Sequence, residues 1–140
     1  MSENKMIVDD QLGEFIYRRA WIGACPVVWV DKELSLRIRL IASQGDAPSA
    51  NQKQALRTFV QSKADVLQKC NVLLKPYCER VYGAECQSKA VESYLEPVAA
   101  VFEKTGEYGL LFKCQFEDEI NLAVKFTGDK AEVGTDDILL

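Results

Sequence analysis

The feature that most constrains the fold is a pair of alternating segments in the last third of the chain. Over residues 110–116, and again over 120–126, apolar side chains recur at every second position. A period of two is typical of β-strands with one buried face. The acidic residues 117–119 between the segments predict the turn of a long antiparallel hairpin. The residues Thr127-Gly128-Asp129-Lys130 predict a further tight turn, before a short last strand over 131–133.

The first third of the chain also reads as strands. Short apolar and aromatic runs over 15–17, 21–23 and 27–30 precede a polar turn at Asp31-Lys32. Residues 34–40 then alternate strictly, with Arg37 and Arg39 on the polar face. We expect those arginines to pair with acids on a neighbouring strand or to contact a partner. Trp21 and Trp29 are expected in the core, although tryptophan is also enriched at interfaces.

The middle of the chain predicts a long amphipathic helix. Ser49 and Gln52 have the spacing of a capping box, and apolar residues follow at helical spacing. Pro76 is expected to end or kink this helix, and Gly83 suits its C-cap. A shorter helix over 89–95 and a strand over 98–102 are expected next. The apolar stripe of the long helix consists of Leu56, Phe59, Val60, Leu67, Cys70 and Leu74.

The order of these segments predicts the fold class. Strands come first, then helices, then strands again, and we expect no βαβ alternation. That order favours an α+β fold, a mostly antiparallel sheet with central helices (about 49–82) packed on one face. With 140 residues, no repeat and no linker, the chain is expected to form one domain over 1–140.

The chain contains no histidine, which narrows the possible chemistry. Catalytic Ser–His and Cys–His pairs are excluded, as is an imidazole proton shuttle. The five cysteines lack C-x-x-C spacing, and their odd number is typical of reduced thiols, mostly small core residues. Phosphate-binding and dinucleotide-binding loops are missing as well. We therefore expect no metal, no cofactor and no catalytic residues.

Charge and targeting signals bear on partners and location. The net charge is −4, but residues up to Leu95 sum to +2 and those from Glu96 onward to −6. An acidic C-terminal third disfavours nucleic acid and would attract a basic protein, although acidic residues also simply keep hairpins soluble. Neither a signal peptide nor a membrane-spanning segment is visible. A cytoplasmic protein with no membrane partner is expected.

Several short motifs carry a family resemblance. They are Asn51-Gln52-Lys53-Gln54-Ala55-Leu56, the Leu95–Pro97 step, the stretch from Phe116 to Leu122, and the ending from Lys130 to Leu139. Together they resemble a family of small bacterial α+β domains often found among immunity proteins of polymorphic and contact-dependent toxin systems. Members of that family tend to carry His-Gly at the hairpin turn, where this chain has Ile120-Asn121. A role tied to that histidine therefore does not transfer.

The resemblance implies a protein that neutralises a cognate bacterial toxin by tight stoichiometric binding and occlusion. The leading hypothesis is thus a non-catalytic immunity protein with a basic toxin domain as its partner. The alternatives are a scaffold domain with a housekeeping partner, and an enzyme that uses carboxylates or a cysteine. A small-molecule pocket and the oligomeric state stay open. The expected partner-binding residues are Glu117, Asp118, Glu119, Asp129, Asp136 and Asp137.

Overall fold

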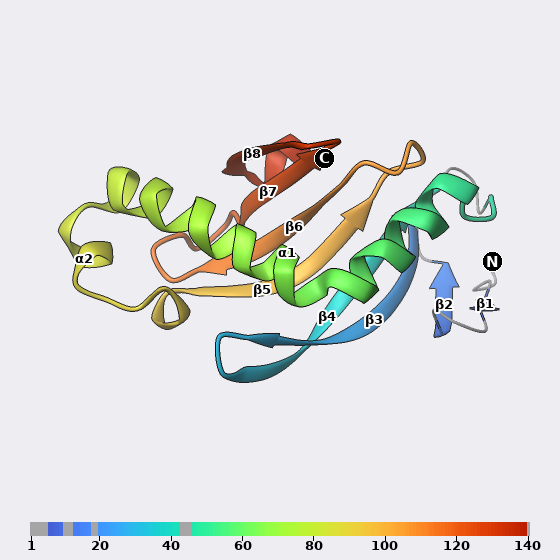
Figure 1. The fold of residues 1–140 in the computed structure, drawn as a ribbon, viewed down its shortest axis with the longest axis horizontal. Helices are drawn as coiled ribbons and strands as arrows, with labels where there is room; N and C mark the ends of the chain where they lie inside the picture. The colour runs from blue at the N-terminus through green and yellow to red at the C-terminus, as the bar shows by residue number, and fades with distance from the viewer. Residues whose placement is uncertain (1–5, 10–12, 18–19, 43–45, 140) are drawn as a thin grey trace.

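The computed structural model describes residues 6–9, 13–17, 20–42 and 46–139. Within them, eight strands form one open sheet whose spatial order follows the chain, and a long helix runs across one side of it (Figure 1). The α+β fold class expected from the sequence is confirmed. The strands are β1 (Met6–Asp9), β2 (Gly13–Tyr17), β3 (Ala20–Trp29), β4 (Lys32–Ile41), β5 (Leu95–Phe102), β6 (Tyr108–Cys114), β7 (Leu122–Thr127) and β8 (Lys130–Thr135). The helices are α1 (Ala50–Tyr82) and α2 (Ala84–Gln87), with 3-10 turns η1 (Val91–Ser93) and η2 (Asp136–Leu139).

One pair of strands departs from the expected topology. β4 and β5 are parallel, while the other neighbouring strands are antiparallel. The chain leaves β4, crosses the sheet as α1 and returns in β5, which makes a βαβ unit at the centre of the sheet. The expectation of no βαβ alternation was therefore wrong. Parallel neighbours require a long crossover connection, and α1 supplies it.

A capping box starts α1, as the sequence predicts. The Ser49 side chain accepts a hydrogen bond from the Gln52 backbone, and the Gln52 side chain accepts one from the Ser49 backbone. Gln52 is completely buried, and its Nε2 also donates to the carbonyls of Ile41 (2.7 Å) and Phe102 (3.0 Å). Those carbonyls end β4 and β5, so one side chain joins the start of α1 to both parallel strands.

The helix continues through Pro76 to Tyr82, and the local break lies elsewhere. Ser62 has the non-helical angles φ −124° and ψ 22°, and its hydroxyl donates to the Thr58 carbonyl at 2.7 Å. Gly83 forms the C-cap with a positive φ of 74°, as expected. Pro76 lies on the exposed face. The sequence thus predicted the limits of α1 correctly, but not the position of its irregularity.

The sheet is covered on both faces. Its helix side packs against the buried stripe of α1, and this core contains both tryptophans and all five cysteines, as expected. A smaller cluster on the opposite face includes Val101, Leu111 and Ala123, with Leu139 of η2 packed on it. Gly109 lets Leu139 lie directly against β6, because a side chain there would overlap it. Burial on both faces explains why β6 is apolar at nearly every position.

Two further expectations need correction. No regular helix forms over 89–95, where the structure has only the single turn η1 before β5 begins. The connection between β6 and β7 is also longer than a tight turn, because Phe116 and Ile120 lie outside the strands. The seven residues 89–95 are too few to form a stable helix without tertiary support, and the buried Val91, Tyr94 and Leu95 lie instead in η1, directly after it and at the start of β5.

No helix in the described part of the chain is long and apolar enough to cross a membrane. The expectation about export rests on residues 1–10, of which the structure describes only 6–9.

Candidate protein-binding surface

The connection between β6 and β7 carries three consecutive acids. Asp118 and Glu119 are exposed, whereas Glu117 is half-buried. The Glu117 backbone donates to the Cys114 carbonyl at 3.1 Å, which closes the turn directly after β6. The Tyr82 hydroxyl donates to Glu117 Oε2 at 2.8 Å. The last turn of α1 therefore holds the first acid of the loop, and the other two project into solvent.

An aromatic cluster lies beneath this loop. The Phe116 ring packs against Tyr82 and Tyr94, with centroids 5.2 Å and 5.8 Å away, and the Lys89 ammonium lies 5.6 Å from its centroid. Burial is the main reason that the pKa of Tyr82 lies well above its usual range, and the hydrogen bond to Glu117 raises it further. The Tyr82 hydroxyl therefore remains a donor at neutral pH. The loop rests on packed rings, which limits its freedom to move.

The chain beyond β8 brings two more acids to the same end of the sheet. The Asp136 backbone donates to the Asn121 carbonyl at 2.9 Å, and the Asn121 backbone donates to Asp136 Oδ2 at 3.3 Å. Asp137 Oδ1 accepts a hydrogen bond from the Thr135 hydroxyl. These bonds extend the β7–β8 ladder by one pair. Asp136 thus contacts the end of the connection that carries the acidic loop, and Asp137 follows it.

Asp129 lies apart from the other predicted residues. It occupies the two-residue turn between β7 and β8 with Gly128, whose φ is +62°. This turn is at the opposite end of β7 from the acidic loop. A strand rises about 3.3 Å per residue, so the length of β7 separates them. Asp129 instead borders a groove beside α1. The structure therefore brings 117–119 and 136–137 together and leaves Asp129 outside that group.

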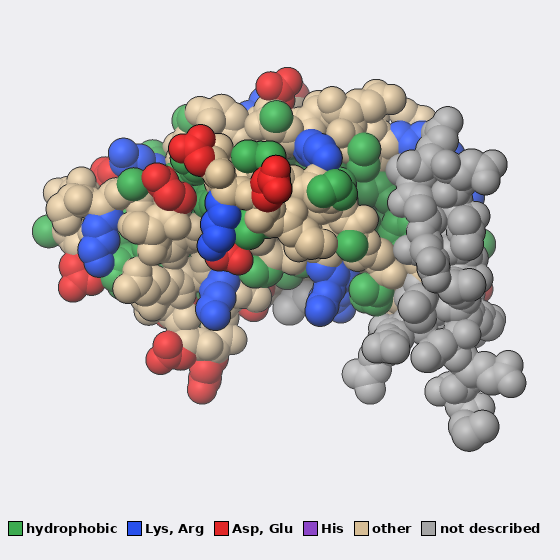
Figure 2. Space-filling view, turned by 90° about the horizontal axis from the view of Figure 1, so that it is seen from below, with side chains coloured by type: hydrophobic (Ala, Val, Ile, Leu, Met, Phe, Trp, Pro, Cys, Tyr) green, Lys and Arg blue, Asp and Glu red, His purple; other side chains and the backbone are tan. Residues whose placement is uncertain are grey.

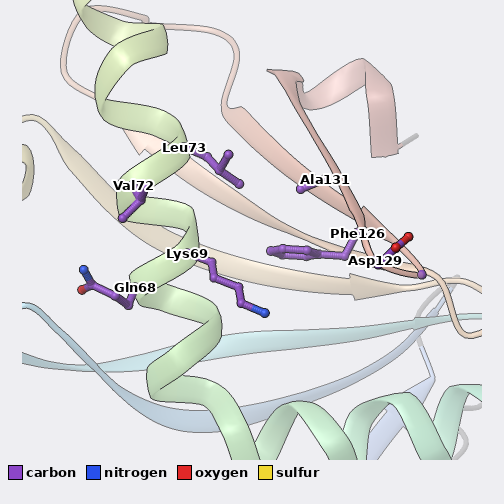
Figure 3. Close-up of a pocket in the computed structure, with 8 residues that line it drawn as sticks. Gln68, Lys69, Val72, Leu73, Phe126, Asp129 and Ala131 are labelled. Atoms are coloured by element: carbon purple, nitrogen blue, oxygen red, sulfur yellow. The ribbon is translucent and has the colours of Figure 1, made fainter.

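The groove beside α1 is a feature that sequence reasoning missed. It has a volume of about 400 Å³, and Asp129 and Ala131 form one wall. Lys69 and Leu73 of α1 point toward them, with Phe126 between (Figure 3), and Val72 also lines the groove. Val72 is 61% exposed although it is apolar. That apolar residue off the buried stripe of α1 is the one signal in the sequence that could have indicated the groove.

A second apolar surface lies at the β3–β4 turn. Val28 and Val30 are 56% and 42% exposed, and they border a hollow of about 220 Å³ beside α1. Val30 has φ +58°, a strained conformation for a β-branched residue. The predicted turn at Asp31-Lys32 is shifted by one residue, because Lys32 pairs with Trp29 and the turn is Val30-Asp31.

The face of the molecule seen in Figure 2 carries charges of both signs, unlike the acidic end of the sheet. In Figure 2, lysines and arginines are interspersed with acids and with hydrophobic side chains, and no single sign dominates. Arg37 is exposed and Arg39 half-buried on β4. By contrast, the acids of the β6–β7 loop and of η2 gather at one end of the sheet.

The cysteines are buried and unpaired. Burial raises the pKa of Cys70 and of Cys78 to about 12, and it also raises the pKa of Cys25 and Cys86. These four thiols therefore stay protonated at neutral pH and are poor nucleophiles. Within the described ranges, no group of three or more Cys, Asp or Glu residues is arranged to hold a metal ion.

No family model, curated protein or solved structure matches this chain. The resemblance to immunity domains therefore stays a prediction from the sequence motifs.

Proposed function

We propose that this chain is a non-catalytic, cytoplasmic immunity protein that binds and occludes a basic toxin domain. The observation that carries the proposal is the anchored acidic end of the sheet. Residues 117–119 and 136–137 come from two separate segments that meet at the same end of the sheet, where Asn121 bonds to Asp136. Hydrogen bonds from Tyr82 and Asn121 hold both segments in place.

An anchored acidic surface suits tight binding of a basic partner for two reasons. Negative charge accelerates encounter with a positively charged surface and fixes the orientation of docking. A loop that is already ordered also loses less conformational entropy when it binds. Asp118 and Glu119 are exposed, so their carboxylates can reach a partner without rearrangement. Ile120 beside them is 37% exposed and adds an apolar contact.

The buried thiols support a binding function over cysteine chemistry. A nucleophilic cysteine needs a depressed pKa and access to substrate, and the raised pKa values of Cys70 and Cys78 run in the opposite direction. Neither nucleic acid nor a membrane is proposed as a partner. A housekeeping scaffold would use the same surface, so the identity of the partner decides between these two protein-binding functions.

The first test compares partners captured from a native lysate by the wild-type chain and by a charge-reversed variant. The variant is Asp118→Lys/Glu119→Lys. The control, Asp31→Lys/Glu33→Lys, makes the same change in charge at two exposed acids near the β3–β4 turn. We expect one basic partner to be retained by the control and lost by the variant. Binding measured with the purified partner should weaken about tenfold or more, and less so at high salt.

The partner's own activity completes the test. If its isolated domain stops bacterial growth, and co-expression of this chain restores growth, the immunity function holds. A captured housekeeping complex would support the scaffold alternative instead. A partner held equally by the variant and the control would place the interface away from the acidic end and contradict the proposal.

A further inference from the structure

The outer edge of β8 offers unpaired backbone groups. β8 ends the sheet, and no strand in the described ranges lies beyond it. The Asp136 backbone N–H bonds inward to Asn121. Backbone groups alternate in direction along a strand, so the amides and carbonyls of Lys130, Glu132 and Gly134 also point toward β7. The amides and carbonyls of the alternate residues, Ala131, Val133 and Thr135, therefore point outward.

Exposed edges of this kind can pair with another strand unless the protein prevents it. β8 contains neither proline nor a bulge, and its two charges, Lys130 and Glu132, permit some pairings and oppose others. An antiparallel pairing of two β8 strands centred on Glu132 would set like charges opposite each other, which is destabilising. Centring the pair on Val133 avoids that clash.

The register centred on Val133 is complementary along the strand. The outward residues then meet as Val133 with Val133 of the second copy and as Ala131 with Thr135, each pair exchanging two backbone hydrogen bonds. On the other face, Lys130 lies opposite Asp136 of the second copy, the first residue of η2, whose Oδ2 also accepts from the Asn121 backbone. The symmetry repeats this opposite-charge contact. Glu132 lies opposite Gly134, which carries no charge. The charges therefore select one register over its neighbour.

The groove beside α1 adds apolar surface to this edge. Ala131 lies on the helix side of β8, with the Phe126 ring beside it and the Leu73 side chain pointing toward it across the groove (Figure 3). Val133 is half-buried on the same side and packs against the core. Two β8 strands paired about a two-fold axis would place both grooves on one side of a continuous sheet, with the Val133 pair between them.

We propose that β8 is a self-association edge through which two copies of this chain pair antiparallel about Val133. The pairing extends one sheet across both copies. It goes beyond the proposed function, because it uses the edge of β8, shares only Asp136 with the acidic end and leaves Asp118 and Glu119 exposed. An interface of one strand and its flanking side chains is small, so we expect a weak dimer with a dissociation constant in the micromolar range.

Sedimentation and light scattering over a range of protein concentrations test the proposal. We expect a mass near twice the 15.7 kDa of one chain at high concentration. Lys130→Asp places like charges opposite Asp136 and should raise the dimer dissociation constant about tenfold. The reciprocal double variant Lys130→Asp/Asp136→Lys restores opposite charges in the same register and should return the constant to near the wild-type value. Asp136→Lys alone should weaken the dimer as well.

A second variant separates pairing from folding. Val133→Pro removes an outward amide and no bond to β7, so it should abolish the dimer while thermal unfolding remains cooperative. Hydrogen exchange should slow at the amides of Ala131, Val133 and Thr135 as the dimer forms. A chain that stays monomeric at hundreds of micromolar contradicts the proposal. So does a dimer that keeps its affinity in Val133→Pro, or in which the double variant fails to rescue Lys130→Asp. The toxin-binding test changes Asp118 and Glu119, which none of these variants alters, so failure of the dimer is distinguishable from failure of toxin binding.

Discussion

At the residue scale, Tyr82 links the core to the acidic loop. Its ring packs on Phe116 at the end of α1, and its hydroxyl is bonded to Glu117. Gln52 has the same kind of role at the start of α1, where one buried amide bonds to the ends of β4 and β5. The Gln52 capping box is visible in the sequence. The Tyr82 contact is not, because it joins residues 35 positions apart.

Replacing Tyr82 by phenylalanine tests whether that hydroxyl anchors the loop. Tyr82→Phe keeps the ring packing but leaves Glu117 without its donor, so we expect the free energy of unfolding to fall by about 1 kcal/mol. Urea unfolding measures this. Tyr77→Phe is the matched control, since a phenylalanine ring retains the contact of Tyr77 with Arg80, and its effect should stay within about 0.5 kcal/mol. Equal effects of the two substitutions would argue against a special role for the Tyr82 hydroxyl.

At the element scale, sequence patterns predicted the helices and strands whose conformation depends on nearby residues. They did not predict features that depend on residues far away in the chain. The capping box, the apolar stripe and Gly83 predicted α1, and alternation predicted β4 and β7. The parallel pairing of β4 with β5 left no local trace, because a strand with parallel or antiparallel neighbours can have the same apolar pattern. The segment 89–95 has apolar residues, but contacts with distant residues set its conformation rather than helix propensity, since Tyr94 packs on Phe116 and its carbonyl accepts from the Gln115 backbone.

Pro76 shows how α1 tolerates an unfavourable residue. It lies on the exposed face, so the helix loses one backbone donor there without any change to the core. A proline inside a helix costs about 3 kcal/mol relative to alanine, partly offset because proline also restricts the unfolded chain. We therefore expect Pro76→Ala to raise the free energy of unfolding by about 2 kcal/mol in urea denaturation. Gly83→Ala is a control with the opposite expected sign. It should lower the free energy of unfolding, because φ +74° disfavours a side chain. An unchanged or lower stability of Pro76→Ala would mean that the proline is favourable where it stands.

At the scale of the whole molecule, the acidic surface depends on the sheet. The sequence shows residues 117–119 and 136–137 as separate acidic groups, and the β7–β8 pairing is what brings them to one end. The same pairing carries Asp129 to the other end, although all six acids belong to the same third of the chain. The groove beside α1 was unpredictable for a related reason, since its walls come from α1, β7 and β8.

The core also determines how the whole molecule responds to alkaline pH. Burial raises the pKa of Cys70 and Cys78 from 9.0, and of Tyr108 from 10.0, to about 12. The folded chain therefore retains protons that the unfolded chain releases above pH 9. Stability is fully present below that pH and is lost as the pH rises toward 12, by about 1.4 kcal/mol per pH unit for a single fully buried group such as Cys70.

Cys70→Ala isolates one of these groups. The variant should be less stable at pH 7, because a buried side chain is shortened, yet its stability should fall less steeply between pH 9 and pH 12. Val66→Ala is the control, because it also shortens a buried side chain of α1 but removes no titratable group. Urea unfolding across that pH range should give Val66→Ala the wild-type slope and Cys70→Ala a shallower one. Parallel slopes for all three proteins would mean that Cys70 ionises as readily in the folded chain as in the unfolded one, and that its surroundings admit water.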